Sequence, residues 1–377
     1  MPERGKSPCP RRVVRGMGSR RRPGQGRSRR GGGWRASGWL LPGLVVAIVA
    51  LMAVTGAVLS DAQPRSLNPQ PTTGASPAPP THASAPPGGW TIQKSGASAR
   101  LDDVSCSDAD HCVAVGADGI ILSTSDGGNT WRPGHSGTTH PLVGVSCPSP
   151  SICYAVSNFG DLLKTGDAGL TWSIQALKNR TPFDVSCPST VDCITADGFA
   201  THDGGSSWQQ ASRLDAVSVE CPTRTVCYAV RNQLGHGVIL VKRGGSWALQ
   251  EVTPYFLDAV TCPGVTSCVA VGGSTSGSNI LTTADGRSWM VQLHSADSQT
   301  LLDVGCLTVE SCFVLDGTPD VLQTTNRGRT WSWQDTGLVG RLNAISCPTL
   351  NSCFVVGSGP ASTGGGFVAH YQTEMTR

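Results

Sequence analysis

The chain has 377 residues, 15 of them cysteine, and a formal net charge of +3. This small value combines two opposite parts, because residues 1–37 carry a net charge of +11 and residues 61–377 carry −8. The acidic balance of the larger part gives no reason to expect nucleic acid as a partner.

The N-terminal part predicts a membrane anchor. Residues 1–37 form an Arg-rich tail, and residues 38–60 are predicted to form a transmembrane helix, because residues 39–59 carry no charge. At about 1.5 Å per residue this run spans about 31 Å, close to the thickness of a hydrocarbon core. Positive charge before the span predicts a cytoplasmic N-terminus and places everything after residue 60 outside the cell membrane.

A cleaved signal peptide is the alternative to an anchor, with Ser60-Asp61-Ala62 as a weak cleavage site. The length of the apolar run and of the basic region favours the uncleaved anchor. The arginines then act as a topology signal with some lipid contact, rather than as a nucleic-acid site.

Residues 61–88 are rich in Pro, Ala, Ser and Thr and almost uncharged. This composition predicts an extended, disordered stalk. The folded domain is predicted over residues 89–372, with a short C-terminal tail at residues 373–377.

The folded part repeats a pair of cysteines six positions apart. The first cysteines of successive pairs are 41, 40, 34, 41, 44 and 41 residues apart, and apolar runs flank a polar bend, which predicts strand, turn and strand. A period of this length suits one four-stranded propeller blade. The pairs are Cys106/Cys112, Cys147/Cys153, Cys187/Cys193, Cys221/Cys227, Cys262/Cys268, Cys306/Cys312 and Cys347/Cys353.

A third apolar run in six of the repeats leads into a turn related to Thr-x-Asp-x-Gly-x-Thr-Trp, after which a fourth strand is predicted to begin at the Trp. One of the six turns, from Val241 to Trp247, lacks the acid. The carboxylate and hydroxyl groups can cap backbone N–H groups of the turn, and Gly supplies the unusual φ. The turn residues are Asp126 and Trp131, Asp167 and Trp172, Asp203 and Trp208, Asp285 and Trp289 in a shortened copy, and Asn326 and Trp331 with Asn in place of Asp.

This turn resembles the Asp-box (BNR) repeat of β-propellers such as sialidases, sortilin-type receptors, some glucanases and photosystem II assembly factor-like propellers. The resemblance covers about residues 90–371. It implies a propeller, and through the assembly factor-like members a scaffold or assembly role, but it does not imply an activity. The cysteine hairpin is an addition to the usual pattern.

Seven hairpins are present but only six box regions follow them. The missing strand is predicted at the other end of the domain, because Trp90 lies 16 residues before Cys106, as Trp131 lies 16 before Cys147. We therefore predict an all-β, seven-bladed propeller closed by strands from both ends of the domain. Six blades and an unpaired tail are the alternative. The fourth-strand tryptophans are interpreted as core residues.

The paired cysteines are predicted to form disulfides within each hairpin, since directly opposed residues of an antiparallel pair lie within disulfide range. Disulfides indicate an oxidising compartment. Zinc is disfavoured because its ligands follow C-x2–4-C spacing and come in fours, whereas seven evenly spread pairs are an odd number. Reduced, buried thiols remain a further alternative. We expect no cofactor and no metal site.

Box turns and cysteine turns are predicted to share one standardised face, which leaves the variable loops of the other face for a ligand. The candidate ligand residues there are His135, His140, Arg180, Arg231, His236, His294 and Asp320. The sequence thus predicts a membrane-anchored, extracytoplasmic, non-catalytic module that binds an unknown envelope protein or glycan. A sialidase-like glycoside hydrolase is the alternative, although the domain offers few Tyr and Glu residues for that chemistry.

Overall fold

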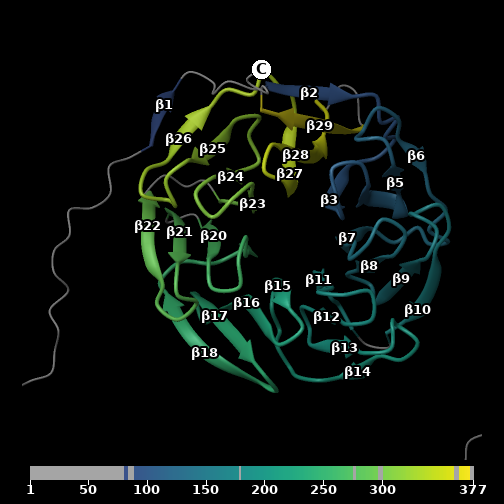
Figure 1. Ribbon diagram of the computed structural model, residues 1–377, viewed down its shortest axis with the longest axis horizontal. Coiled ribbons are helices and arrows are strands. Elements are labelled where there is room, and N and C mark those ends of the chain that lie inside the picture. Colours follow the sequence, from purple (N-terminus) through teal and green to yellow (C-terminus); the bar gives the residue numbers. More distant parts are fainter. Residues whose placement is uncertain are drawn as a thin grey trace, which may run out of the picture. The chain divides into compact units, whose positions relative to one another are not determined.

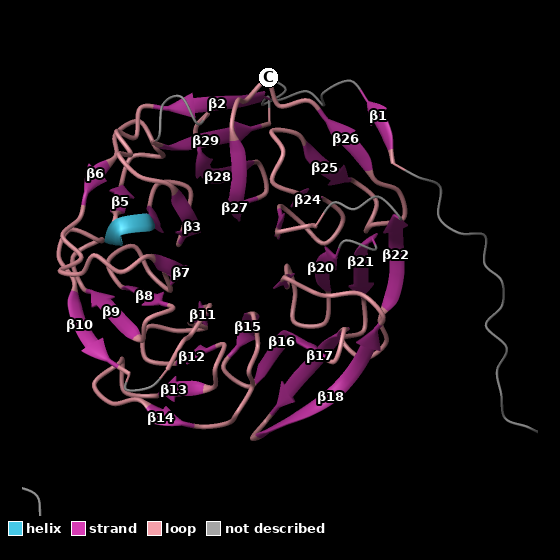
Figure 2. Cartoon of the chain, turned by 180° about the vertical axis from the view of Figure 1, so that it is seen from behind, coloured by secondary structure: helices cyan, strands magenta, loops and turns pink. Residues whose placement is uncertain are grey.

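The computed structural model describes residues 80–83, 89–177, 180–274, 277–295, 300–360 and 365–373, which all belong to one compact unit, Gln70–Arg377. Seven β-sheets stand around a common axis, as Figure 1 shows from one side and Figure 2 from behind. The predicted basic tail, the predicted transmembrane helix and most of the predicted stalk lie outside the described residues. Within the described ranges no helix has the length and hydropathy needed to cross a bilayer.

Each sheet is a blade with four strands counted from the axis outward, which follow chain order in blades 1 to 6. Blade 1 contains β3 (Leu101–Cys106), β4 (Cys112–Gly116), β5 (Ile121–Thr124) and β6 (Arg132–Pro133), with the short 3-10 helix η1 (Ala117–Gly119) between β4 and β5. Blade 2 contains β7 (Leu142–Ser146), β8 (Cys153–Ser157), β9 (Asp161–Thr165) and β10 (Ser173–Ala176). Blade 3 contains β11 (Val185–Ser186), β12 (Cys193–Thr195), β13 (Phe199–Thr201) and β14 (Gln209–Gln210).

The next three blades follow the same order. Blade 4 contains β15 (Ser218–Thr223), β16 (Val226–Gln233), β17 (His236–Arg243) and β18 (Ser246–Thr253). Blade 5 contains β19 (Ala259–Thr261), β20 (Cys268–Ser274), β21 (Gly277–Thr283) and β22 (Met290–Ser295). Blade 6 contains β23 (Asp303–Cys306), β24 (Cys312–Leu315), β25 (Val321–Thr324) and β26 (Ser332–Gln334).

Blade 7 joins the two ends of the domain. Its three inner strands are β27 (Arg341–Thr349), β28 (Ser352–Ser358) and β29 (Gly366–Gln372), and its outer strand is β2 (Gly89–Gln93). β2 runs antiparallel to β29, with Trp90 opposite Tyr371. The predicted seven blades and the predicted closure are therefore confirmed, and the six-bladed alternative is wrong.

Blade 6 carries a fifth strand that the sequence did not lead us to expect. β1 (Thr81–Ala83) pairs in parallel with β26, with Thr81 opposite Ser332. These three residues belong to the segment predicted as a disordered stalk. Strand pairing with the folded domain thus begins before residue 89.

The hydrophobic core consists of seven clusters, one between each pair of neighbouring blades. Each cluster holds one tryptophan that begins or precedes a fourth strand. Trp131 of blade 1, for example, meets Phe354 of blade 7 edge to face with ring centroids 6.2 Å apart. The seven are Trp90, Trp131, Trp172, Trp208, Trp247, Trp289 and Trp331.

The core role of these tryptophans is as predicted, but two details differ. Trp131 and Trp331 are buried, whereas the other five are half-buried. Five of the seven come one residue before the fourth strand rather than starting it, since only Trp90 and Trp247 lie inside β2 and β18. The indole therefore packs from the turn into the blade interface.

All seven predicted cysteine pairs form disulfides, each within one hairpin and with Cα atoms 3.9–4.1 Å apart. In blades 1 and 6 the two cysteines are directly opposite in the antiparallel ladder, as expected. Zinc coordination and free buried thiols are thereby excluded for these fourteen residues.

The hairpin of blade 4 departs from the predicted opposition of the two cysteines. Cys227 is bonded to Cys221, but it is the second residue of β16 rather than the first. The register between β15 and β16 shifts between Glu220 and Thr223, so Cys227 is not opposite Cys221 in the ladder, and its ladder partner is Lys242 of β17. The physical reason is a β-bulge, which lets the hairpin pair beyond the disulfide, at Thr223 and Val226.

Cys227 is a buried residue of the hydrophobic core. Its side chain is 2% exposed and packs in the core cluster that also holds Trp247. Cys227 is therefore a structural residue of the blade interface, and its disulfide offers nothing to a ligand. In blade 7 the register shifts in the same way between Ser346 and Thr349, beside the Cys347–Cys353 disulfide.

The box turns have the predicted local geometry. Asp167 accepts hydrogen bonds from the N–H and O–H groups of Thr171 at 2.9 and 2.6 Å and from the O–H of Thr165 at 2.7 Å. These hydrogen bonds, those from the Thr171 side chain foremost, lower the pKa of Asp167 to about 2. Gly169 has φ 86°, a left-handed conformation that suits glycine.

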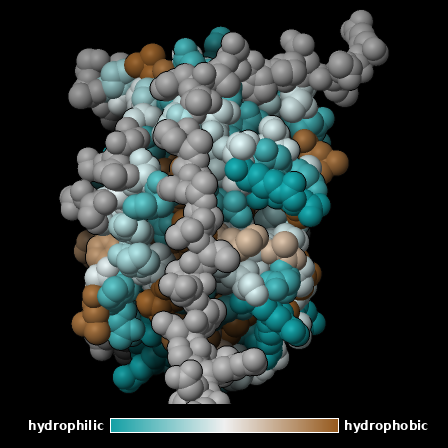
Figure 3. Space-filling model, turned by 90° about the vertical axis from the view of Figure 1, so that its left-hand side faces the viewer, coloured by the Kyte–Doolittle hydropathy of each residue, from teal (hydrophilic) through white to brown (hydrophobic). Residues whose placement is uncertain are grey.

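Box turns and cysteine turns lie on the same face of the disc. In five blades a backbone N–H of the box turn donates to a carbonyl of the cysteine turn, as Ala168 does to Ser151. We call this side the box face and the opposite side the loop face. The rim between them is formed by the outer strands, and Figure 3 shows that apolar and polar patches alternate on one side of it.

Candidate functional site

A central channel is the first candidate site. The innermost strands of the seven blades surround a cavity of about 490 Å³. Six acidic side chains line it, and no Lys, Arg or His is among its lining residues, all of which are described. The acids are Asp102, Asp103, Asp184, Glu220, Asp258 and Asp303.

Three of these aspartates clasp neighbouring blades together. Asp103, Asp184 and Asp303 each stand three residues before the first cysteine of their hairpin. One carboxylate oxygen accepts the N–H of the next residue, and the other accepts an N–H from the innermost strand of the following blade. The second contacts are Asp103 to Val145 (2.7 Å), Asp184 to Val219 (2.9 Å) and Asp303 to Ile345 (2.8 Å).

Serines just before the first cysteine make a second set of links. Ser105 Oγ, for instance, accepts the N–H of Cys147 in the next blade at 3.0 Å. Ser146, Ser186 and Ser346 do the same for the following cysteine. The inner edge of an innermost strand has no strand partner, so side chains of the preceding blade satisfy N–H groups that burial would otherwise leave unpaired.

Burial raises the pKa values of the channel acids. The pKa of Asp303 is raised to about 7 and that of Asp184 to about 6, against the effect of their backbone hydrogen bonds. Burial and then the charge of Asp184 raise the pKa of Glu220 to about 7. Burial also raises the pKa of Asp258 to about 6 and that of Asp103 well above its usual range.

Raised carboxyl pKa values are also found in glycosidases, but the three clasp aspartates are committed elsewhere, as is Asp102, which pairs with Arg100 at 2.6 Å. The clasp aspartates use both oxygens on backbone N–H groups. The tyrosines are no better placed for a nucleophilic role, because Tyr154 and Tyr228 are fully buried and donate to the carbonyls of Thr190 and Val265. The channel therefore offers carboxyl groups and hydrogen-bond acceptors to a ligand.

The predicted ligand residues of the loop face lie on several blades. His140 is 2.6 Å from Asp161 and stacks on Phe159, while His294 is 3.0 Å from the hydroxyl of Tyr255 and stacks on its ring. Arg180 lies over the ring of Phe199 and bonds Gln210, and Arg231 donates to Gln233 and to the carbonyl of Leu214. His135 is exposed and bridges to Thr171, so it lies beside the box turn of blade 2 rather than with the other residues predicted for the loop face. His236 is exposed, and Asp320 is half-buried. The contacts of His140, Arg180, Arg231 and His294 are local, so these four form no common cluster, and a ligand role for the seven stays a prediction.

Apolar side chains on the loop face were missed by the sequence reasoning. Five large ones are exposed in its loops, namely Phe159, Phe183, Leu234, Phe256 and Val339. Phe183 is 49% exposed and also lines the channel. The channel mouth thus combines an aromatic surface with acidic groups, and neither feature follows the repeat pattern from which the sequence predictions were made.

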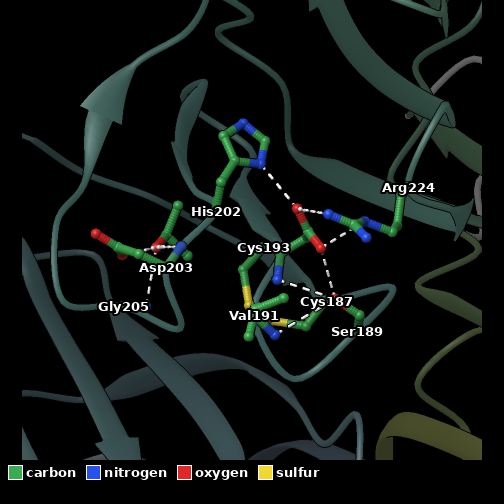
Figure 4. Close-up of polar contacts among 10 residues, drawn as sticks. Cys187, Ser189, Val191, Cys193, His202, Asp203, Gly205 and Arg224 are labelled. Carbon is green, nitrogen blue, oxygen red and sulfur yellow. Dashed lines mark hydrogen bonds and ion pairs between the residues drawn. A yellow bond between two sulfur atoms is a disulfide. The ribbon is translucent and has the colours of Figure 1, made fainter.

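A polar cluster on the box face centres on Asp192 (Figure 4). This buried carboxylate accepts hydrogen bonds from Ser189 (2.7 Å) and Arg224 (2.7 Å), and it lies 2.8 Å from Nδ1 of His202. Burial alone would raise the pKa of Asp192, but the hydrogen bonds outweigh burial and lower it. Ser189 and His202 both point at the carboxylate, which is not the serine–histidine contact of a catalytic triad.

The described residues contain no group of three or more His, Cys, Asp or Glu side chains placed to hold a metal ion. A cofactor has no specific residue set to assign within this part of the chain.

The profile of the family described as "Photosynthesis system II assembly factor YCF48" matches residues 83–251. The chain resembles the BNR-type propellers. This resemblance covers the first four blades by sequence, and no curated protein matches the chain.

Solved structures extend the likeness to the whole disc. A structure titled "YCF48 bound to D1 peptide" has 20% identity and a TM-score of 0.62, covering 78% of this chain and 100% of that one. YCF48 from Cyanidioschyzon merolae has 18% identity and a TM-score of 0.60, covering 76% and 99%. The WD40 propeller of Doa1 follows with 11% identity and a TM-score of 0.58, covering 77% and 98%. At these identities the likeness shows the fold alone.

Proposed function

We propose that the central channel of this propeller is a non-catalytic binding site for a protein partner, and that the propeller is held at the outer side of a cell membrane by one N-terminal helix. The observation that carries the proposal is the channel mouth, where Phe183 is exposed beside a cavity lined by six acids and no base. Such a site suits an extended segment that carries apolar and basic side chains.

Two further features support a protein partner. The net charge of −8 over residues 61–377 attracts a cationic segment at long range. One structural relative is titled as bound to a peptide, which is said of that protein only. A glycan remains the other ligand class for the test, and no observation favours a glycosidase.

The membrane placement rests on the sequence. A net charge of +11 before an uncharged run of about 31 Å supports an anchor with the propeller outside. Seven disulfides support an oxidising compartment. A reporter that is active only in the cytosol, fused after residue 377, should be silent, and an active reporter would refute the topology.

Binding is tested with the purified full chain on an array of synthetic 12-residue peptides that vary in charge and aromatic content. Peptides with both basic and apolar residues should bind, and binding should weaken with added salt. The variants Phe183→Ala and Glu220→Gln should lose this binding. Leu350→Ala is the control and should keep this binding. Leu350 is an exposed apolar residue like Phe183, at 73%, but it lies in a cysteine turn of the box face, away from the channel mouth of the loop face.

The contrary results are equally definite. Binding to a glycan array but to none of the peptides would replace the protein partner by a glycan. Turnover of a fluorogenic glycoside that disappears in Glu220→Gln would overturn the non-catalytic reading.

A further inference from the structure

A second cavity, of about 840 Å³, lies on the box face where the chain closes the ring. Both ends of blade 7 line it, namely Gly89 at the start of β2 and Thr373 just after β29. In the other six blades a turn joins the third and fourth strands, whereas in blade 7 these strands come from opposite ends of the domain. We call this cavity the seam pocket.

A serine and a histidine are paired in the wall of the seam pocket. Oγ of Ser352 lies 2.7 Å from Nε2 of His370. Both residues line the pocket and both are 6% exposed. Both side chains therefore border the pocket, from which a reacting group would have to enter.

The strand register explains why the pair forms. Ser352 at the start of β28 lies opposite Gln372 of β29, and His370 is two residues from Gln372, so both side chains project from the same face of the sheet. His370 itself lies opposite Phe354 and stacks on its ring with centroids 4.1 Å apart and planes 5° apart. The imidazole is thus held in one orientation by a cross-strand pair.

No other blade has this combination. A serine also precedes the second cysteine in blades 5 and 6, as Ser267 and Ser311. The third-strand residue that corresponds to His370 is Thr282 in blade 5 and Gln323 in blade 6. Three serines therefore share one position in the repeat, and of these Ser352 is paired with a histidine.

We propose that Ser352 is a nucleophile with His370 as its general base, and that the seam pocket accepts small uncharged carboxylic esters. In the first step Ser352 Oγ bonds to the carbonyl carbon and its proton passes to His370 Nε2. The bond from carbon to the alcohol oxygen breaks, and the alcohol leaves with that proton. Water then releases the acyl group by the same steps in reverse order.

The surroundings define the substrate class. The pocket wall includes the side-chain amides of Gln93, Asn129 and Asn351. Those of Gln93 and Asn129 already donate to Thr91 and to the carbonyl of Asp126, whereas the amide of Asn351, beside Ser352, can donate to a polarised carbonyl oxygen. The pocket wall also includes Asp110 and Asp126 and no basic residue besides His370, so an anionic ester is disfavoured. Burial lowers the pKa of His370, which keeps the imidazole neutral and able to accept a proton near pH 7.

The described residues supply no third member to the pair. None of them is hydrogen-bonded to Nδ1 of His370, so none of their carboxylates stabilises the imidazolium. Loss of such a carboxylate costs a serine hydrolase about 10⁴-fold in kcat. Ser352 is therefore expected to react with activated esters and fluorophosphonates, and to turn over unactivated esters slowly.

The test treats the purified full chain with a fluorophosphonate probe and maps the adduct by mass spectrometry. One adduct is expected, on Ser352, although Ser267 and Ser311 are more exposed. His370→Gln should slow labelling by about 100-fold or more, the usual contribution of a general base. The labelling rate of the unaltered chain should fall at acidic pH as His370 becomes protonated.

Hydrolysis of p-nitrophenyl acetate gives a second readout. It should be lost in Ser352→Ala and kept in Ser311→Ala, with unchanged circular dichroism in both. Absence of a Ser352 adduct on the folded chain, equal adducts on all three serines, or a rate unaffected by His370→Gln would each overturn the proposal. Peptide binding at the channel mouth is independent of every one of these results.

Discussion

Trp90 and Tyr371 lie opposite each other in the ladder between β2 and β29, with ring centroids 5.1 Å apart. Trp90 also meets Phe313 of blade 6 edge to face at 5.8 Å. The Trp90 side chain, from the start of the domain, therefore contacts β29 of blade 7 and β24 of blade 6. The ring is closed both by backbone pairing and by this aromatic contact.

Removing the aromatic contact should weaken the closure of the ring at blade 7. Trp90→Ala is expected to lower the free energy of unfolding by about 3 kcal/mol, at the low end for a large aromatic because Trp90 is half-buried. Ile92→Ala is the matched control on the same strand, since Ile92 is 60% exposed, and it should cost less than about 0.5 kcal/mol. Urea unfolding followed by far-ultraviolet circular dichroism measures both. Equal effects would show that the strand closes the ring through its backbone alone.

This closure could be predicted from the sequence because each element that makes it recurs. The cysteine spacing marks the hairpin in every blade, and the distance from Trp90 to Cys106 repeats that from Trp131 to Cys147. Disulfides, blade number and box turns all depend on contacts within one repeat or on its period. Short-range contacts of this kind produce a regular pattern in the sequence.

Contacts between blades produce a less regular sequence pattern. Asp103, Asp184 and Asp303 stand at one position relative to the cysteines, but four of the seven blades have other residues there. These aspartates were therefore not predicted to link neighbouring blades. The seam pocket depends on where the chain ends meet, and β1 depends on a partner strand far along the chain. Such features follow from the closed ring rather than from any single repeat.

The channel acids predict an unusual pH dependence. Glu220 has a folded-state pKa raised to about 7 from 4.5, so between these pH values the folded chain holds a proton that the unfolded chain has lost. The contribution of Glu220 to the free energy of unfolding is therefore fully present below about pH 4.5 and is lost as the pH rises through 7. At about 1.4 kcal/mol per pKa unit, Glu220 accounts for about 3 kcal/mol.

Glu220→Gln should accordingly leave stability at pH 4.5 unchanged, raise it at pH 8 and flatten the decline between them. Glu310→Gln is the control, because Glu310 is exposed and paired with Arg327, which lowers its pKa. Urea unfolding at both pH values provides the measurement. A variant as unstable as the unaltered chain at pH 8 would mean that Glu220 is ionised at little cost in the folded state.

The disulfides predict a simple thiol count. Seven bonds use fourteen of the 15 cysteines, which leaves Cys9. The unreduced chain, denatured and titrated with a thiol reagent, should show one thiol, and Cys9→Ser should show none. Replacing Cys347 and Cys353 together by Ser should cost about 2 kcal/mol in the chain-entropy model for so short a loop. A count near 15 from cells that export the protein would contradict the oxidised state.

The Asp192 cluster predicts an asymmetry between its partners. Asp192 is 6% exposed and serves three donors, one of which, Arg224, reaches it from blade 4. Asp192→Ala leaves all three donors without their acceptor and should cost about 2–3 kcal/mol. Arg224→Ala should cost less than about 1 kcal/mol, because the Arg224 side chain is 64% exposed and water replaces its partner.

The double variant separates a local from an inter-blade role for this carboxylate. If Asp192 mainly orders its own cysteine turn through Ser189 and His202, adding Arg224→Ala to Asp192→Ala should change stability little further. Urea midpoints of the two single variants and the double variant give the coupling energy. A loss in Arg224→Ala as large as that in Asp192→Ala would instead assign the stabilisation to the link between blades 3 and 4. The buried carboxylate would then act as a clasp on the box face, as Asp184 does between the same two blades at the channel.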